Sequence, residues 1–227
     1  MPANRHPAPG VRRWRCGWRF ERAARSQGAA LIAGVDEVGR GALFGPVVAA
    51  AVVFDGEPRL RGMKDSKQLT AAERQAWEPR IRQCARQWAI AACDAGRIEW
   101  INIYQASRLA MLDAIRGLAV QPDWLLVDAV KLDWPGPQQA IVHGDALSIS
   151  IAAASILAKE HRDRLMRQWD RIYPAYGLFR NKGYATAEHL AALQQYGPTP
   201  QHRRSFLSEL TAPQWIATAG EVEPPLS

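Results

Sequence analysis

The sequence predicts an α/β domain with a mixed central sheet flanked by helices, and two features of its pattern carry this prediction. Two apolar runs, residues 31–35 and 47–54, are separated by a short glycine-rich connection. That connection is too short for a crossover helix, so the two strands are expected to be antiparallel neighbours. Strand-like and helical segments then alternate along the chain, which places helices on the faces of the sheet.

The elements after the second strand follow from capping signals and periodicity. Thr70 opens a helix with Glu73 in capping-box spacing, and this helix is expected to reach about residue 86. The apolar runs at 88–93, 124–130 and 140–143 predict three more strands, and residues 103–118 form an amphipathic helical pattern.

Two helices are expected in the C-terminal part of the chain. The first runs from about Ser148 to the Tyr173-Pro174 pair, and its core stripe is Ile149, Ala152, Ala153 and Ile156. The second opens at Thr186 and closes at Gly197-Pro198. Together they predict a helical C-terminal extension of the sheet domain.

Length and composition indicate one globular domain with unevenly distributed charge. The chain has 227 residues, of which 48% are apolar, and its formal net charge is +7. Seven arginines and a single acid fall within residues 1–28. We therefore expect a basic, flexible N-terminal arm over 1–28, a main domain over 29–212 and a disordered proline-rich tail over 213–227. The arm either binds a polyanion or is merely solvated.

Localisation signals and cysteines are sparse. No apolar run approaches the ~18 residues of a membrane span, and the N-terminal segment lacks the apolar stretch of a secretory signal. The cysteines, Cys16, Cys84 and Cys93, form no Cys-x-x-Cys pair. We expect Cys84 and Cys93 to be core residues, as well as Trp88 and Trp124 beside their strands. This usage predicts a reducing, cytoplasmic environment.

Carboxylates follow three of the expected strands. Asp36 and Glu37 follow the first strand, Asp128 lies near the end of the run at 124–130, and Asp145 follows the run at 140–143. If these strands are neighbours, the acids converge and would repel one another unless cations lie among them. Hard oxygen ligands of this kind suit Mg²⁺ or Mn²⁺. For a single acid, a turn or a helix cap is the simpler interpretation.

Glu37 poses a geometric difficulty, because successive strand residues point to opposite faces. Both Asp36 and Glu37 can serve one site only if the chain leaves regular strand after Asp36 or if Glu37 reaches around the edge. The glycines that follow, Gly39 and Gly41, permit such a departure.

The segment Gly39-Arg40-Gly41 is a candidate for contact with a phosphate or a sugar. Its spacing to Gly45 does not fit a dinucleotide-binding fingerprint, and a strand rather than a helix follows it. Glycines allow backbone groups to approach a ligand closely, and Arg40 could hold a phosphate. A tight turn with an exposed arginine is the alternative.

A long series of ordered blocks resembles the type 2 ribonucleases H, ribonuclease HII of bacteria in particular. The resemblance covers residues 31–207, and its blocks lie at 34–41, 45–46, 65–69, 128, 144–145, 150–159, 162–163, 173–174, 176–177, 181–184, 189 and 202–206. Because the blocks are long and occur in order, a chance match is excluded in practice.

The resemblance implies a ribonuclease H-like fold and an endonuclease that depends on divalent cations. It implies that Asp36, Glu37, Asp128 and Asp145 are the catalytic, metal-binding carboxylates. The substrates would be RNA/DNA hybrids and duplex DNA with embedded ribonucleotides, cut on the 5′ side of a ribonucleotide to leave 3′-hydroxyl and 5′-phosphate ends. Such an enzyme removes ribonucleotides from DNA, and we expect a monomer.

The resemblance also implies residues that bind the substrate. Gly39, Arg40 and Gly41 match the loop whose backbone contacts the ribose 2′-OH, and Tyr184 matches the tyrosine at the RNA–DNA junction. Lys67 and Lys182 are candidate phosphate ligands, and Lys159 and Arg162 are weaker ones.

Three positions depart from the family pattern without removing a carboxylate: Ala42, Ala129 and His143 stand where proline, glycine and lysine are common. Two other functions remain as alternatives, another nuclease of the same broad fold and a non-catalytic nucleic-acid-binding module. Dependence of cleavage on a divalent metal distinguishes the module from a nuclease.

Overall fold

A five-stranded mixed sheet forms the centre of the molecule, in a computed structural model that describes residues 16–60, 62–63 and 66–208. The strand order is β3-β2-β1-β4-β5. β1 (Ile32–Val38) pairs antiparallel with β2 (Val47–Phe54), and β2 pairs antiparallel with β3 (Ala85–Cys93). β4 (Trp124–Asp128) lies parallel to β1, and β5 (Gln138–Ile141) lies parallel to β4. The predicted antiparallel pair and mixed sheet are confirmed.

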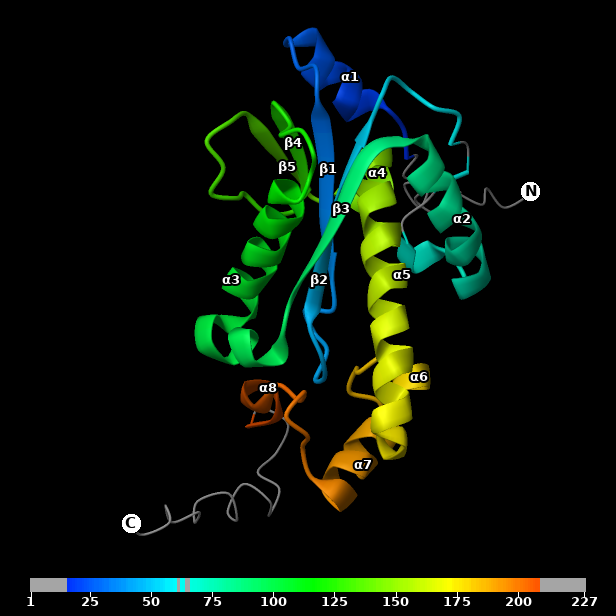
Figure 1. Ribbon diagram of the computed structural model, residues 1–227, viewed down its shortest axis with the longest axis vertical. Coiled ribbons are helices and arrows are strands. Elements are labelled where there is room, and N and C mark those ends of the chain that lie inside the picture. Colours follow the sequence, from blue (N-terminus) through cyan, green and yellow to red (C-terminus); the bar gives the residue numbers. More distant parts are fainter. Residues whose placement is uncertain (1–15, 61, 64–65, 209–227) are drawn as a thin grey trace, which may run out of the picture.

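Helices cover both faces of the sheet. α3 (Ala95–Arg116) lies on one face, and α5 (Ile149–Ile172) with α2 (Ala71–Cys84) lies on the other (Figure 1). β2 is buried along its whole length because its alternate side chains enter two cores. Val47 and Ala49 pack on the α3 side, whereas Val48 and Ala50 pack on the α5 side.

α5 packs very closely on β1. Ser148 caps the helix by accepting a hydrogen bond from the N–H of Ile151, and the expected stripe of Ile149, Ala152, Ala153 and Ile156 is buried. Gly34 of β1 lies directly against its first turn, since a Cβ at this position would be 2.1 Å from the carbonyl carbon of Ser150. The small residues on both elements therefore set how near the helix comes to the acids of β1.

The N-terminal segment is folded onto the domain from residue 16. α1 (Arg19–Ser26) buries Ala24, and its Glu21 is 1% exposed. Glu21 Oε1 accepts hydrogen bonds from Ser148 Oγ (2.6 Å) and from the N–H of Ser150 (2.9 Å). The expectation of a flexible arm over residues 1–28 is therefore wrong for its last part, while residues 1–15 lie outside the described residues.

The C-terminal extension lies at the end of α5, below the sheet in Figure 1. It contains α6 (Leu178–Asn181), α7 (Ala187–Tyr196) and α8 (Arg204–Ser208). Three shorter segments complete the described elements: η1 (Ser66–Gln68), α4 (Gly144–Leu147) and η2 (Pro174–Tyr176). The extension has its own apolar cluster, which includes Leu43 and Phe44 from the loop between β1 and β2. The expected tail over 213–227 lies outside the described residues.

Several expected boundaries need correction. β1 runs on through Asp36 and Glu37 to Val38 instead of ending at residue 35. α3 consists of two helical segments joined by a kink at Asn102 (φ 64°, ψ 163°). The second segment corresponds to the helix predicted from residue 103, whereas the first, which begins at Ala95 and is capped by Asp94, was not predicted. The Asp94 carboxylate accepts a hydrogen bond from the N–H of Arg97.

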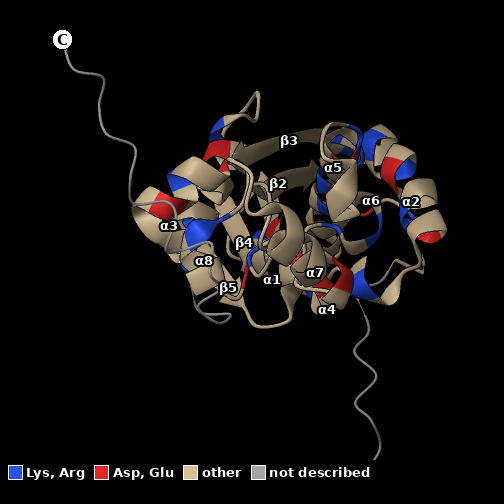
Figure 2. Cartoon of the chain, turned by 90° about the horizontal axis from the view of Figure 1, so that it is seen from below, with Lys and Arg blue, Asp and Glu red and all other residues tan. Residues whose placement is uncertain are grey.

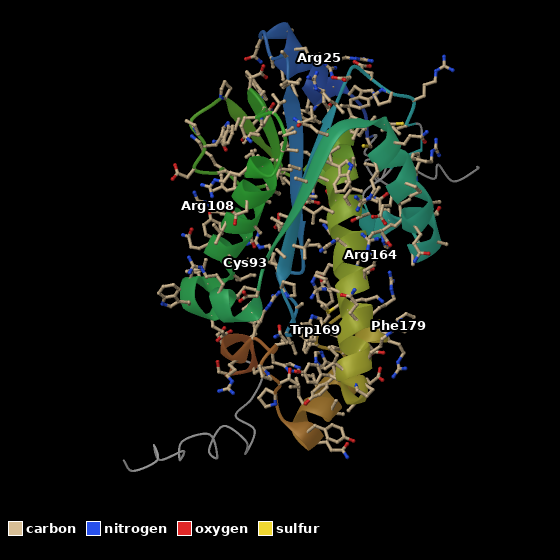
Figure 3. The ribbon with its side chains drawn as sticks, in the orientation of Figure 1. Arg25, Cys93, Arg108, Arg164, Trp169 and Phe179 are labelled. Atoms are coloured by element: carbon tan, nitrogen blue, oxygen red, sulfur yellow. The ribbon has the colours of Figure 1, made fainter. Side chains whose placement is uncertain are left out.

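Two predicted core residues are at the surface. Cys84, at the end of α2, is exposed, and Trp88 is 37% exposed beneath the guanidinium of Arg82. Cys93 is buried at the end of β3 that lies beside α3 (Figure 3). Within the described ranges, no helix is both long and apolar enough to cross a membrane.

Candidate active site

Three carboxylates meet where β1, β4 and α4 come together. Asp36, Asp128 and Asp145 each offer an oxygen, and these oxygens all lie within 4.8 Å of one another. Asp36 and Asp145 are each 3% exposed, and Asp128 is half-buried. The predicted convergence of these three acids is therefore observed.

Strand register explains why Asp36 and Asp128 are neighbours. Val35 of β1 is paired with Val127 of the parallel β4, so the next residue of each strand carries an acid at the same level. Asp145 arrives differently, because it lies in α4 and not at a strand end. His143 adopts a left-handed conformation (φ 58°) before this helix, and the N–H of Gly144 donates to Asp128 Oδ1 (2.7 Å).

Glu37 lies beside these three acids without joining their group of mutually close oxygens. β1 remains regular here, with Glu37 paired to Ala49, and the expected departure from regular strand does not occur. Arg40 Nη1 is 3.3 Å from Glu37 Oε1. Glu37 Oε2 is buried and has no hydrogen-bond partner among the described residues. One carboxylate oxygen at the site is thus left for a cation or a donor from outside the chain.

The pKa values of Asp36, Glu37 and Asp128 are all raised, because these carboxylates are buried close to other negative charges. Burial raises the pKa of Asp36 well above its ordinary value, and the nearby Glu37 and Asp128 raise it further. Burial also raises the pKa of Glu37, against the opposing charge of Arg40, and it raises the pKa of Asp128 with Asp145 adding to the effect. The donor set is buried, oxygen-only and short of positive charge, which fits divalent metal ions.

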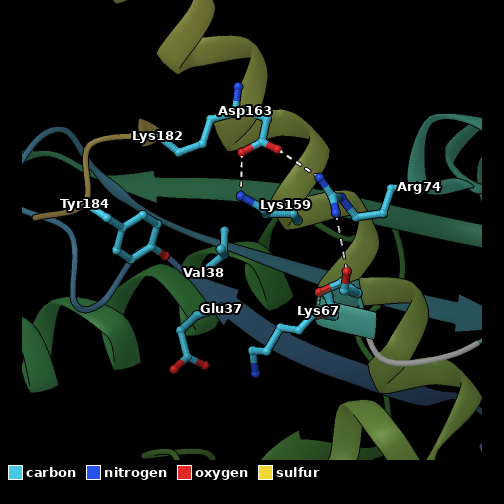
Figure 4. Close-up of a pocket in the computed structure, with 10 residues that line it drawn as sticks. Glu37, Val38, Lys67, Arg74, Lys159, Asp163, Lys182 and Tyr184 are labelled. Carbon is cyan, nitrogen blue, oxygen red and sulfur yellow. Dashed lines mark hydrogen bonds and ion pairs between the residues drawn. The ribbon is translucent and has the colours of Figure 1, made fainter. Parts of the chain in front are cut away.

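A pocket of about 360 Å³ opens next to the acids. Glu37 lies on one side and Tyr184 on another, and basic side chains of Lys67, Lys159 and Lys182 surround it (Figure 4). Figure 2 shows Lys and Arg residues on α2, α5 and α6, which lie next to this pocket, and also on α3 and α8. The wall is therefore suited to an anionic ligand.

The candidate lysines differ in how they are held. Lys67 Nζ is 3.1 Å from Asp145 Oδ2, so this side chain connects η1 to the acids. Lys159 pairs with Asp163 at 2.6 Å, an ion pair between residues four apart on α5. Lys182 Nζ donates to the carbonyl of Phe179, and burial lowers its pKa.

The loop between β1 and β2, residues 39–46, is the glycine loop. One side of it is packed against the protein and the other side is open. Gly39 adopts φ 92°, and a Cβ there would meet Arg162 Nε at 2.3 Å, so only glycine fits this position. Gly41 has no heavy atom within 4 Å of a Cβ built on it. The backbone at Gly41 is thus accessible to a ligand, while Gly39 is supported from behind.

That support comes from a buried arginine, which corrects one expectation. Arg162 is 0% exposed and cannot contact a phosphate, although the sequence made it a candidate. Its guanidinium donates to the carbonyls of Phe44 (3.0 Å), Pro46 (3.1 Å) and Lys182 (2.8 Å). Arg162 therefore connects the glycine loop to the loop before Tyr184.

A second buried arginine, Arg203, reinforces this arrangement. It donates two hydrogen bonds to the carbonyl of Gly45 and one to the carbonyl of Arg40. Burial and the nearby Arg162 lower the pKa of Arg203 to about 9. The sequence contained Arg203 within a matching block but gave no sign that it supports the loop, because its partners are backbone atoms.

Tyr184 lies between these elements. Its N–H donates to the carbonyl of Asn181 (3.0 Å), and the Arg162 guanidinium lies 5.5 Å from its ring centroid. Figure 4 shows the ring directed into the pocket beside Glu37. Arg74 was missed by the sequence analysis, yet it bonds Glu160 (3.0 Å) and Asp163 (3.3 Å) at the rear wall.

Comparison with known proteins identifies the family. The family model described as "Ribonuclease HII" matches residues 33–209. The chain belongs to the ribonuclease HII family. A Ribonuclease HII of Koribacter versatilis is 54% identical over 209 residues, which are 92% of this chain and 80% of that protein. One from Solibacter usitatus is 54% identical over 88% of each chain.

A solved structure agrees with the ribonuclease HII assignment. The ribonuclease H2 of Pyrococcus horikoshii OT3 superposes with a TM-score of 0.67 at 27% identity, over 78% of this chain and 93% of that one. The predicted family resemblance and the ribonuclease H-like fold are confirmed.

Proposed function

We propose that this chain is an endoribonuclease that hydrolyses the RNA strand of RNA/DNA hybrids and nicks duplex DNA on the 5′ side of an embedded ribonucleotide. The products would be 3′-hydroxyl and 5′-phosphate ends, and the role would be removal of ribonucleotides from DNA. The observation that carries the proposal is the placement of three clustered acids beside an accessible glycine backbone and a pocket tyrosine in a ribonuclease HII chain.

The proposed metal ligands are Asp36, Glu37, Asp128 and Asp145, with Mg²⁺ or Mn²⁺ as the ions. The raised pKa values of Asp36, Glu37 and Asp128 and the unpartnered Glu37 Oε2 support this assignment. When bound, such ions stabilise negative charge on phosphodiester oxygens and make water a better nucleophile. The chain's own part is to hold the carboxylates in register and to keep Lys67 near Asp145.

Recognition of RNA would depend on the ribose 2′-OH, the group that distinguishes the two nucleic acids at one sugar. We assign its recognition to Gly39, Arg40 and Gly41, because the backbone at Gly41 is accessible and Arg40 is held by Glu37. Lys67 and Lys182 are assigned to phosphates of the substrate, since both line the pocket.

Tyr184 would pack against the deoxyribose at an RNA–DNA junction and use its hydroxyl near the ribose. Tyr184→Phe is expected to cost about 0.5–1.5 kcal/mol of transition-state stabilisation, the scale of one neutral hydrogen bond. Tyr184→Ala should impair single-ribonucleotide substrates more than long hybrids, because only the former require a junction. The measurement is kcat/KM on two labelled duplexes, one with a single ribonucleotide and one with a long RNA tract. Equal losses on both would reject the junction role.

We further propose that the enzyme acts as a monomer in the cytoplasm. Support for a reducing compartment comes from Cys84 and Cys93, which form no disulfide. Light scattering of the purified protein tests the monomer.

A further inference from the structure

Two buried histidines lie behind Tyr184, and nothing in the proposed chemistry uses them. His189 of α7 is 0% exposed and His202 is 2% exposed. Their Nε2 atoms are 3.0 Å apart. His189 Nδ1 lies 2.9 Å from the carbonyl oxygen of Tyr184, and the N–H of Thr199 donates to His202 Nδ1 (2.9 Å). All four ring nitrogens are thus engaged.

The two ends of this chain of hydrogen bonds decide where each proton lies. A backbone N–H can only donate, so His202 Nδ1 must accept from Thr199 and carries no proton. Neutral His202 then carries its proton on Nε2 and donates it toward His189 Nε2. His189 accordingly has its proton on Nδ1, and the carbonyl of Tyr184, which can only accept, receives it. The two rings are opposite tautomers.

A positive charge on either ring is incompatible with this arrangement of donors and acceptors. An imidazolium carries protons on both nitrogens, so it would place two N–H groups face to face at one of the contacts. Burial lowers the pKa of both histidines, that of His202 to about 3 with His189 contributing. The rings therefore remain neutral through the range in which a nuclease would work.

The histidine pair also touches the glycine loop. The His202 ring packs edge-on against Phe44 at a centroid distance of 4.8 Å, and the N–H groups of Leu43 and Phe44 donate to the carbonyl of Gly183. The segment before Tyr184 is thus held by the loop on one side and by His189 on the other.

We propose that His189 and His202 are positioning residues whose ordered, neutral pair fixes the backbone of Tyr184 and thereby sets the preference for an RNA–DNA junction over a continuous hybrid. This inference rests on the junction role proposed for Tyr184. The histidines touch neither the acids nor the pocket, so their effect passes through the Tyr184 carbonyl and through Phe44 of the loop between β1 and β2.

The tautomers can be measured directly in the full-length protein. Long-range ¹H–¹⁵N correlation spectra of histidine-labelled enzyme should show His189 protonated at Nδ1 and His202 protonated at Nε2 between pH 5 and pH 8. Signals are assigned by their loss in His189→Phe and His202→Phe. The reverse tautomers, or an imidazolium at pH 7, would overturn the proposal.

Activity supplies the second measurement, as the ratio of kcat/KM for a single-ribonucleotide duplex to that for a long hybrid. His189→Phe keeps an aromatic ring but no donor, and it should lower this ratio roughly 5-fold, the scale of one buried hydrogen bond. His189→Asn should restore most of the ratio, because its amide nitrogen can take the place of Nδ1. His161→Gln, on the half-buried histidine of α5, is the matched control and should leave the ratio unchanged.

The outcomes distinguish the positioning role of the histidine pair from a merely structural role, and they also distinguish its failure from failure of the proposed function. A structural role would lower thermal stability and both activities equally, so an unchanged ratio in His189→Phe overturns the inference. If Tyr184→Ala also leaves the ratio unchanged, the junction role of Tyr184 falls. In that case the NMR spectra alone test whether His189 and His202 form the ordered pair, because the tautomers are measured without substrate.

Discussion

At the scale of single residues, the proposed metal ligands lower the stability of the protein that carries them when no cation is bound. Asp36 is almost wholly buried among other carboxylates, and its pKa is raised well above the ordinary value. A raised folded-state pKa means that the folded protein binds this proton more tightly than the unfolded chain. Stability contributed by the protonated acid is therefore present at low pH and is lost as pH rises through the folded pKa.

We predict that Asp36→Asn abolishes metal-dependent cleavage and yet stabilises the enzyme at pH 8 when a chelator is present. A gain on the order of 1 kcal/mol would raise Tm by about 2–4 °C for a chain of this size. The gain should vanish below pH 4, where Asp36 is protonated in both states. Thermal unfolding at several pH values checks this.

Saturating Mn²⁺ provides the control for the Asp36→Asn prediction, because ligands that bind only the folded state stabilise it. The wild-type protein should then become the more stable of the two. A variant that stays less stable than wild type at pH 8 in chelator would contradict the electrostatic explanation. The same design applies to Glu37→Gln and Asp128→Asn, because the pKa values of these two acids are also raised. These two variants and Asp145→Asn should each reduce turnover severely.

At the scale of elements, the packing of α5 on β1 determines how the acids are held. Gly34 is two residues before Asp36, and it allows the first turn of α5 to approach the strand more closely than any side chain would permit. Ser155 of the same helix lies near Asp36 and lowers its pKa in opposition to burial, through a side-chain hydrogen bond. The helix and the strand thus form one unit around the site.

We predict that Gly34→Ala destabilises the fold by roughly 3 kcal/mol or more, because its Cβ would overlap the backbone of Ser150 and neither element can move freely. Gly17→Ala is the matched control, since a Cβ at residue 17 meets nothing within 4 Å. Urea unfolding of both variants is the measurement. Equal stability of the two would show that α5 can shift without cost.

The elements also show what the sequence could and could not predict. Local patterns predicted the antiparallel pairing of β1 and β2, the Thr70 capping box and the buried stripe of α5. The first segment of α3 was missed because Asn102, with a positive φ, separates it from the periodic pattern that begins at residue 103. The folded α1 was missed because its arginines concealed the buried Glu21.

For the site, the sequence indicated the acids and the pocket residues but not what supports them. The acids could be found because each lies near the end of an expected strand and also belongs to a matching block. Arg203 and His202 also lie in such a block, but the partners of Arg203 are the distant backbone carbonyls of Arg40 and Gly45, and the partner of His202 is His189 on α7. Contacts of this kind depend on tertiary structure, so periodicity and spacing could not reveal them.

At the scale of the whole molecule, positive charge is concentrated in the N-terminal sequence. Residues 1–15, which lie outside the described part, contain Arg5, Arg12, Arg13 and Arg15 and no acid. The folded residues 16–28 must be kept in any truncation, because Glu21 is bonded to the start of α5.

We predict that removing residues 1–15 weakens duplex binding and flattens its salt dependence without moving the cleavage position. Each phosphate contact that is lost removes about 0.9 from the slope of log affinity against log salt. Binding titrations at several salt concentrations measure that slope for both proteins. An unchanged slope would mean that these arginines take no part in binding. Thermal unfolding controls for loss of α1.

The pairing of Phe44 with His202, and of Gly45 with Arg203, has a consequence for how the enzyme is made. Chains emerge from the ribosome N-terminus first and tend to fold in that order. The strands and carboxylates can assemble while the last segment is still unsynthesised, whereas the loop from Arg40 to Gly45 gains its supports only when residues 202–203 arrive. On the proposed function, a nascent or truncated chain would contain the proposed metal ligands before its substrate-binding loop is supported. Substrate selectivity would then be the last property that the nascent protein acquires.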